Sequence, residues 1–149
     1  MMDAIDKKIL NIIQKDFPVV AEPWKAIAEG LGLKESEVLK RVRKLKDEGI
    51  IRRIGAVFDT RKLGFASTLC AARVPKEKLK DFVDVVNSYA GVTHNYRRKH
   101  DYNVWFTFIA RDQDTLNKYL AQIRERTGIA DVTSMSAAQT FKIDATFEL

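Results

Sequence analysis

The first fifty residues carry apolar side chains at helical spacing in three separate runs. The first run predicts an amphipathic helix over residues 3–16, which ends at Phe17 because the following proline disfavours helical backbone there. A second helix is predicted from Pro23 to Gly30, with proline in a tolerated first-turn position. A third helix follows a glycine turn and runs from Lys34 to Gly49. Its inward-facing residues are expected to be Val38, Val42 and Leu45.

This order of helices is typical of a helix-turn-helix domain, which we place at residues 1–58. Residues 50–58, IIRRIGAVF, favour a short extended wing at its end. Residues 59–64 form a linker, and the apolar spacing changes after it. Strands are predicted at about 66–74, 92–99, 103–110 and 131–143, with one helix starting at Pro75 and another running from Asp112 to Gly128.

Residues 65–149 therefore form a β-α-β-β-α-β domain of the ferredoxin-like kind, and the whole chain is an α+β protein. The predicted strand 103–110 is apolar on both faces, because Val104, Phe106 and Phe108 alternate with Trp105 and Ile109. We expect the two helices to cover one face and a partner subunit to cover the other. The protein is then an obligate homodimer or a heterodimer with a homologous subunit.

Composition limits the class of protein. The chain has 149 residues, of which 46% are apolar and 31% charged, as in a soluble globular protein. No apolar run approaches the roughly 20 residues that would span a bilayer, and the amphipathic N-terminus is not a secretory signal, so we expect no membrane partner. Cys70 is the only cysteine, which excludes an intrachain disulfide and a thiolate-rich metal cage. A reducing cytoplasm is the simplest location.

The net charge of +6 suits an anionic partner. A recognition helix reads base edges with its N-terminal residues, where this chain places Glu35 and Glu37. Cations lie further along the same helix, at Lys40, Arg41, Arg43 and Lys44. They could contact DNA phosphates without reading sequence, or they could form a solvated basic face. We therefore expect no sequence-specific DNA binding.

The densest chemistry lies in the predicted hairpin, residues 91–110. Alternation along the first strand predicts that one face carries Val92, His94, Tyr96, Arg98 and His100. The two histidines would then lie roughly 20 Å apart if the strand is fully extended. The candidate site residues are His94, Tyr96, Arg97, Arg98, Lys99, His100, Tyr102, Asn103 and Trp105.

Each of these residues has a structural explanation when it is taken alone. A histidine can be a satisfied structural residue, cations can protect a strand edge, and tyrosine and tryptophan can serve packing. Their clustering is harder to explain structurally, because an ordinary hairpin does not need so many polar groups. We therefore predict a small-molecule site on the hairpin, near a dimer interface.

The chain resembles the Lrp/AsnC family over nearly its whole length, through Asp3, Asp6, Ile9 and Leu10, the segment AIAEGLGLKESEVLKRVRKLKDEGII and the linker. Within that family, THNYRRKHDYNVWFTF and RRIGAVFDTRKLGF are similar to the sirohaem decarboxylase branch. That resemblance implies removal of acetate carboxyl groups from sirohaem, in alternative haem or haem d1 biosynthesis, by two paired homologous subunits. It also implies that His94, Tyr96, Arg98 and His100 belong to the substrate site.

The residues suit such a substrate, which is an iron tetrapyrrole with apolar faces and a rim of carboxylates. Arg97, Arg98 and Lys99 can hold the rim, and Tyr102 and Trp105 offer surfaces for the macrocycle. A histidine or tyrosine could protonate the carbanion that decarboxylation leaves. Alternatively, His94 or His100 could ligate the substrate iron. No motif for a separate cofactor is visible, so the expected enzyme is a non-oxidative carbon–carbon lyase.

Two other functions compete with this one. The chain could be a ligand-responsive transcriptional regulator of the Lrp/AsnC type, in which the hairpin senses an effector. It could also be a haem-binding subunit without turnover. The glutamates of the third helix argue against the regulator, and the hairpin cations favour a polyanionic ligand over an amino acid.

Overall fold

The computed structural model describes residues 2–144 and 146–149, and the chain divides into two compact units. The helix-turn-helix unit holds the residues up to Ala56 together with the terminal segment 142–149. The sheet unit is Val57–Phe141. Each unit has its own cluster of buried apolar side chains.

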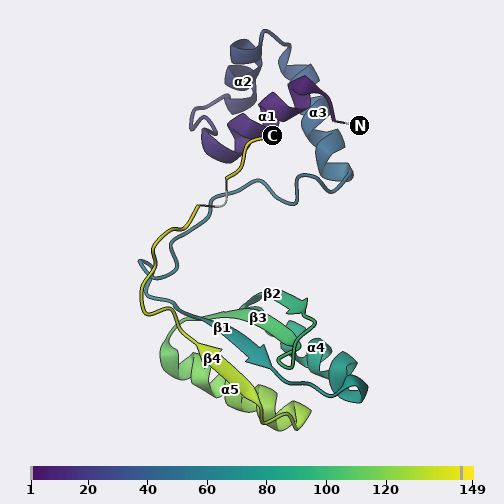
Figure 1. Ribbon diagram of the computed structural model, residues 1–149. Helices are drawn as coiled ribbons and strands as arrows, with labels where there is room; N and C mark the ends of the chain where they lie inside the picture. The colour runs from purple at the N-terminus through teal and green to yellow at the C-terminus, as the bar shows by residue number, and fades with distance from the viewer. Residues whose placement is uncertain (1, 145) are drawn as a thin grey trace. The chain divides into compact units, whose positions relative to one another are not determined.

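The helix-turn-helix unit contains α1 (Ala4–Lys15), α2 (Pro23–Leu31) and α3 (Glu35–Asp47), which agree with the three predicted helices (Figure 1). The side chain of Asp3 caps α1 by accepting from the backbone N–H of Asp6, and the Asp6 carboxylate accepts from the N–H of Asp3. Gly32 ends α2 with a φ of 67°, which glycine adopts without steric cost. The core forms around Ile9, Ile27, Val38, Val42 and Leu45.

Two features of this unit differ from the sequence-based expectation. Residues 50–58, all of them described, contain no strand, so the predicted wing does not form. The terminal segment 142–149 belongs to this unit, although the sequence assigns residues 65–149 to one domain. The Gln14 side chain explains this difference, because its amide bonds both the carbonyl and the N–H of Phe147.

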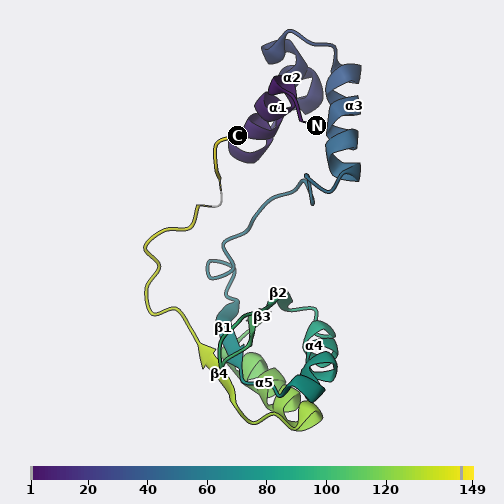
Figure 2. The same cartoon turned by 45° about the vertical axis from the view of Figure 1, so that its right-hand side comes forward.

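The sheet unit has the predicted β-α-β-β-α-β order, with the strands arranged β2-β3-β1-β4 and every neighbouring pair antiparallel (Figures 1 and 2). Its elements are β1 (Ala66–Ala72), a 3-10 turn (Lys76–Lys78), α4 (Leu79–Asn87), β2 (Val92–Arg97), β3 (Val104–Ala110), α5 (Gln113–Thr127) and β4 (Val132–Met135). Helices α4 and α5 cover one face of the sheet, which we call the helix-covered face. The opposite face carries no other element of the sheet unit, and we call it the open face.

The core of the sheet unit lies between the helices and the helix-covered face. Phe82 and Leu116 from the helices pack with Phe106 and Phe108 of β3, and all four are fully buried. Cys70 lies in the same core, where burial raises the pKa of its thiol to about 12. Strand β4 is much shorter than the predicted strand 131–143, because its pairing with β1 ends at Met135.

Among the described residues, no helix combines the length and the apolar character that crossing a membrane requires.

Candidate functional site

A β-bulge in β2 changes which side chains share a face. The register shifts between Val92 and His94, so Val92 pairs with Phe108 on the helix-covered face while His94 pairs with Thr107 on the open face. The predicted row of Val92, His94, Tyr96, Arg98 and His100 on one strand face is therefore wrong at both of its ends. Val92 lies on the opposite face, and Arg98 and His100 lie beyond Arg97, where the strand ends.

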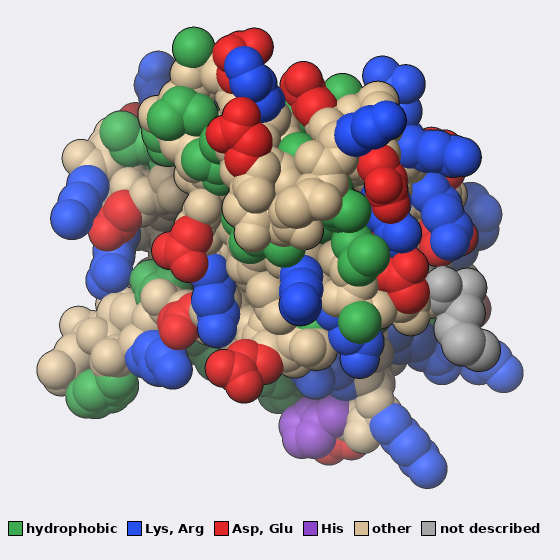
Figure 3. All heavy atoms as spheres, turned by 90° about the horizontal axis from the view of Figure 1, so that it is seen from above, with side chains coloured by type: hydrophobic (Ala, Val, Ile, Leu, Met, Phe, Trp, Pro, Cys, Tyr) green, Lys and Arg blue, Asp and Glu red, His purple; other side chains and the backbone are tan. Residues whose placement is uncertain are grey.

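His94 and Tyr96 form a pair on the open face. Their rings stack with centroids 6.0 Å apart, and both side chains are exposed. The Thr93 hydroxyl lies 3.0 Å from Nδ1 of His94, so a hydroxyl orients this imidazole. Tyr96 pairs with Trp105 across the strands, which places an aromatic surface beside the histidine. In the space-filling view, histidine side chains reach the molecular surface (Figure 3).

The last residue of β2 and the connection to β3 gather the cations. We call residues 97–103 the cationic turn, since they include Arg97, Arg98 and Lys99. These three residues, with His100 and Trp105, line an open cavity of about 580 Å³, which we call the cationic hollow. Of the predicted site residues, the structure brings these five together around one hollow, and His94 and Tyr96 do not line it.

Hydrogen bonds fix the shape of the cationic turn. The Trp105 indole donates to the carbonyl of Tyr102 at 2.7 Å, and the Arg98 guanidinium lies over the Trp105 ring, 5.7 Å from its centroid. The backbone N–H of Tyr102 donates to Nδ1 of His100 at 3.1 Å. The rings of His100 and Tyr102 stack at 6.4 Å, so His100 is held from two directions.

Asn103 uses its side chain for the protein itself. Its Oδ1 accepts from the N–H of Val74 at 2.9 Å, and its Nδ2 donates to the carbonyl of Val74 at 2.8 Å. The sequence-based hypothesis placed Asn103 among the substrate-binding residues, and the geometry gives its amide a structural partner instead. Next to it, Tyr102 lies under the guanidinium of Arg73, 5.3 Å from the ring centroid. Arg73 and Val74 had no signal in the sequence, because their role depends on the end of β1 lying beside the turn.

The charges of the cationic turn are not neutralised by the surrounding chain. Within the described part of the protein, no carboxylate forms an ion pair with Arg97, Arg98 or Lys99. Guanidinium groups bind carboxylates through two parallel hydrogen bonds. The turn can therefore hold an external polycarboxylate.

The second candidate region is α3, where Arg41 is already engaged. Its guanidinium contacts Asp3 at 2.7 Å, Asp6 at 2.8 Å and Glu37 at 3.2 Å. The hydrogen bond from Arg41 lowers the pKa of the Asp3 carboxyl, and the Asp6 backbone N–H lowers it further. Because it is held by three carboxylates, Arg41 ties α3 to α1 and is not free to contact DNA phosphate as the sequence suggested.

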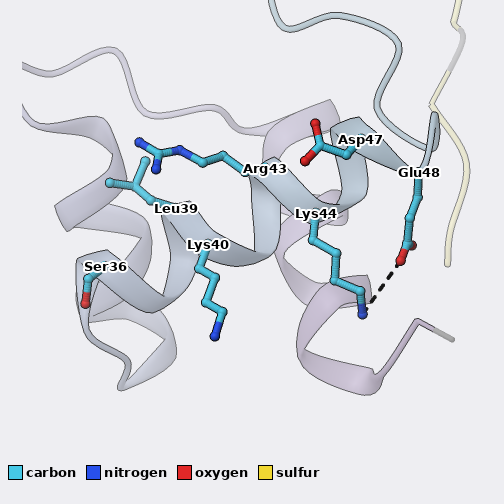
Figure 4. Close-up of a pocket in the computed structure, with 7 residues that line it drawn as sticks. All are labelled: Ser36, Leu39, Lys40, Arg43, Lys44, Asp47 and Glu48. Carbon is cyan, nitrogen blue, oxygen red and sulfur yellow. Dashed lines mark ion pairs between the residues drawn. The ribbon is translucent and has the colours of Figure 1, made fainter.

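The other basic residues of α3 remain at the surface. Lys40, Arg43 and Lys44 line a shallow hollow of about 620 Å³ together with Asp47 and Glu48 (Figure 4). The Lys44 ammonium and the Glu48 carboxylate lie 3.9 Å apart. The Arg43 side chain extends along the helix, and Asp47 lies on the next turn. The mixture of signs limits the attraction of this surface for a polyanion.

No cluster of three or more histidine, cysteine, aspartate or glutamate side chains that could hold a metal ion occurs among the described residues.

Comparison with known proteins agrees with both units. Residues 6–52 match the family profile described as the siroheme decarboxylase NirDL-like HTH domain, and residues 62–142 match the AsnC-like ligand binding domain. The siroheme decarboxylase alpha subunit of Oleidesulfovibrio alaskensis is 49% identical over 99% of this chain and 90% of its own. The siroheme decarboxylase NirD subunit of Pseudomonas aeruginosa is 39% identical over 99% of this chain and 97% of its own.

A solved structure extends the likeness to three dimensions. The siroheme decarboxylase NirDL, in co-complex with an iron-uroporphyrin III analogue, superposes with a TM-score of 0.71 at 37% identity over 93% of this chain. This chain spans 47% of that longer chain. Given the full-length identities to its relatives and the match of both units, the chain belongs to the sirohaem (siroheme) decarboxylase family of Lrp/AsnC-like proteins.

Proposed function

We propose that this chain is a subunit of a sirohaem decarboxylase, a lyase that removes acetate carboxyl groups from an iron tetrapyrrole. The observation that carries the proposal is the cationic turn, whose cations form no ion pair with any described carboxylate and line a hollow beside the aromatic open face. Sirohaem offers matching surfaces, with carboxylates on its rim and apolar macrocycle faces. Membership of the family supports the same substrate.

The reaction needs no oxidant. The bond between the methylene carbon and the carboxylate carbon breaks, carbon dioxide leaves, and the electron pair stays on the methylene carbon beside the pyrrole. A proton from the protein then converts that carbon to a methyl group. The protein must therefore hold the macrocycle, keep the reacting acetate away from stabilising cations, and supply one proton.

The cationic turn suits the carboxylates that do not react. A guanidinium bound to the reacting carboxylate would stabilise the ground state more than the transition state, where the charge moves onto the macrocycle. Arg97, Arg98 and Lys99 therefore grip other rim carboxylates, and their binding energy orients the substrate. His100 lies in the same hollow and contributes to this grip.

His94 and Tyr96 suit the reacting acetate. They stand on the open face and do not line the cationic hollow, although Tyr96 pairs with Trp105, which does line it. Either side chain can donate a proton, and the hydroxyl of Thr93 orients the His94 imidazole. In this arrangement His94 is the general acid, and Tyr96 supports its ring by stacking.

The open face also suits a partner subunit. Leu69 and Met135 are exposed on this face, and the cross-strand partners of Leu69 place Thr107 and Met135 beside it. A second homologous sheet would cover these side chains and enclose the His94–Tyr96 pair, which a single chain leaves in water. The expected assembly is a homodimer or a paired heterodimer. A stable, fully folded monomer in light scattering at micromolar concentration contradicts this assembly.

The test of the proposed function is incubation of the purified protein, with its homologous partner, with sirohaem under reducing, oxygen-free conditions. A Soret shift reports binding. The product mass is expected to fall by the mass of one carbon dioxide for each acetate side chain that is decarboxylated. Binding without a mass change supports a haem-binding subunit without turnover. If the protein gives no Soret shift and no mass change, the proposal is contradicted and the transcriptional regulator becomes the better explanation.

A further inference from the structure

The amide of Asn103 joins two segments that are far apart in the sequence. Both of its polar atoms bond the backbone of Val74, 29 residues away, in the pattern that a paired strand residue would use. Arg73 contacts the neighbouring Tyr102 ring from the same segment and forms an ion pair with Asp131 at 3.2 Å. The segment that directly follows β1 therefore supports the end of the cationic turn through two consecutive residues, Arg73 and Val74.

From this geometry we infer that Asn103 is a positioning residue for carboxylate recognition, and the inference rests on the proposed function. The carbonyl of Asn103 accepts the backbone N–H of Arg98 at 2.8 Å. Fixing Asn103 against Val74 therefore fixes the backbone of an arginine that lines the hollow. The side chain acts through the turn, and it does not need to touch the substrate.

The same support sets the hydrogen-bonding state of His100. The backbone N–H of Tyr102 can only donate, so Nδ1 of His100 must accept in this arrangement. A neutral imidazole whose Nδ1 accepts carries its proton on Nε2. His100 thus offers a hydrogen-bond donor to a carboxylate, as the neighbouring cations do. Moving Tyr102 and Asn103 would release this constraint together with that on Arg98.

A purely structural role for Asn103 makes a different prediction. If the amide only stabilises the fold, its loss weakens the binding of every ligand to the same extent. If the amide positions carboxylate-binding groups, the loss of affinity is larger for a ligand that presents more carboxylates to the turn. Sirohaem and haem separate the two cases, because both are iron tetrapyrroles and haem carries fewer carboxylates.

The experiment titrates the protein, co-purified with its homologous partner, with each tetrapyrrole under reducing, oxygen-free conditions. The variants are Asn103→Ala, which removes both bonds, and Asn103→Gln, which keeps the amide but moves it by one methylene. Asn87→Ala is the matched control, because it removes an asparagine that bonds the β2 residue Asn95 on the helix-covered face. Thermal melting is measured for every protein.

We expect the sirohaem dissociation constant to rise about tenfold in Asn103→Ala, as loss of one charge-assisted hydrogen bond would produce. Asn103→Gln should give a smaller rise in the sirohaem dissociation constant. The affinity of both Asn103 variants for haem should change less than about threefold, because haem presents fewer carboxylates to the turn. Asn87→Ala should bind both ligands like wild type. Sirohaem affinities within twofold of wild type in both Asn103 variants overturn the inference, as do equal losses for the two ligands. Failure of the wild-type protein to bind sirohaem overturns the proposed function instead.

Discussion

Helix α3 and the cationic turn both concentrate lysine and arginine, and their surroundings give those charges different roles. On α3, Arg41 is held by Asp3, Asp6 and Glu37, and Lys44 lies near Glu48. In the cationic turn, no described carboxylate forms an ion pair with an arginine or with Lys99. A count of charges therefore does not distinguish the two regions, whereas the ion pairs of those charges do.

The largest expected effect comes from removing the paired arginine of the helix-turn-helix unit. Arg41→Ala leaves the carboxylate of Asp6, which is buried, without its cation. We expect a loss of about 3 kcal/mol in the free energy of unfolding of this unit, because an unpaired buried charge is costly. Arg43→Ala, two positions away on the surface, is the control and should change stability by less than about 0.5 kcal/mol. Chemical denaturation followed by circular dichroism measures both, and equal stability of the two variants refutes the structural role of Arg41.

The unpaired arginines should show the opposite behaviour. Arg97→Ala and Arg98→Ala are each expected to weaken sirohaem binding about tenfold, because each removes a charge-assisted contact with a rim carboxylate. Melting temperatures should stay close to wild type, since both side chains are exposed. Lys40→Ala on α3 is a control of like charge and should bind sirohaem normally. Equal losses of stability and affinity in an Arg97 or Arg98 variant mean that the residue is structural.

The smallest expected effect is DNA binding by α3. Lys40 and Arg43 can contact phosphate, while Glu35, Glu37 and Asp47 oppose a polyanion. We predict weak binding without sequence preference, lost as the salt concentration approaches about 200 mM. Electrophoretic mobility shifts across a salt series measure it. A footprint on a single promoter that persists at that salt concentration contradicts the prediction and supports a regulator.

The helices and the order of elements could be predicted because their signals are local. Apolar spacing located α1, α2 and α3, and the cap at Asp112 with the glycine at Gly128 located α5. The predictions of a wing and of a long last strand were wrong for the same reason. A strand-like pattern forms a strand only where a partner strand is available, and residues 50–58 and those beyond Met135 have no such pairing within the described chain.

The composition of the candidate site could be predicted, but its geometry could not. The alternation of side chains along a strand does not reveal the bulge between Val92 and His94, which places Val92 on the other face. The histidines were expected on one strand, and the turn instead carries His100 into the cationic hollow. The partner of Asn103 depends on Val74, which only the folded chain brings into contact.

The most direct test of the account compares His94→Ala with His100→Ala in a single turnover of sirohaem. The two histidines occupy different surroundings, one on the open face and one in the cationic hollow. We predict that His94→Ala binds sirohaem with an unchanged Soret shift and releases no decarboxylated product. His100→Ala should bind more weakly and still form product at saturating substrate.

Loss of the Soret shift in His94→Ala would identify that imidazole as a ligand to the substrate iron instead of the proton donor. If both variants bind and decarboxylate sirohaem like wild type, the hairpin is not the catalytic site.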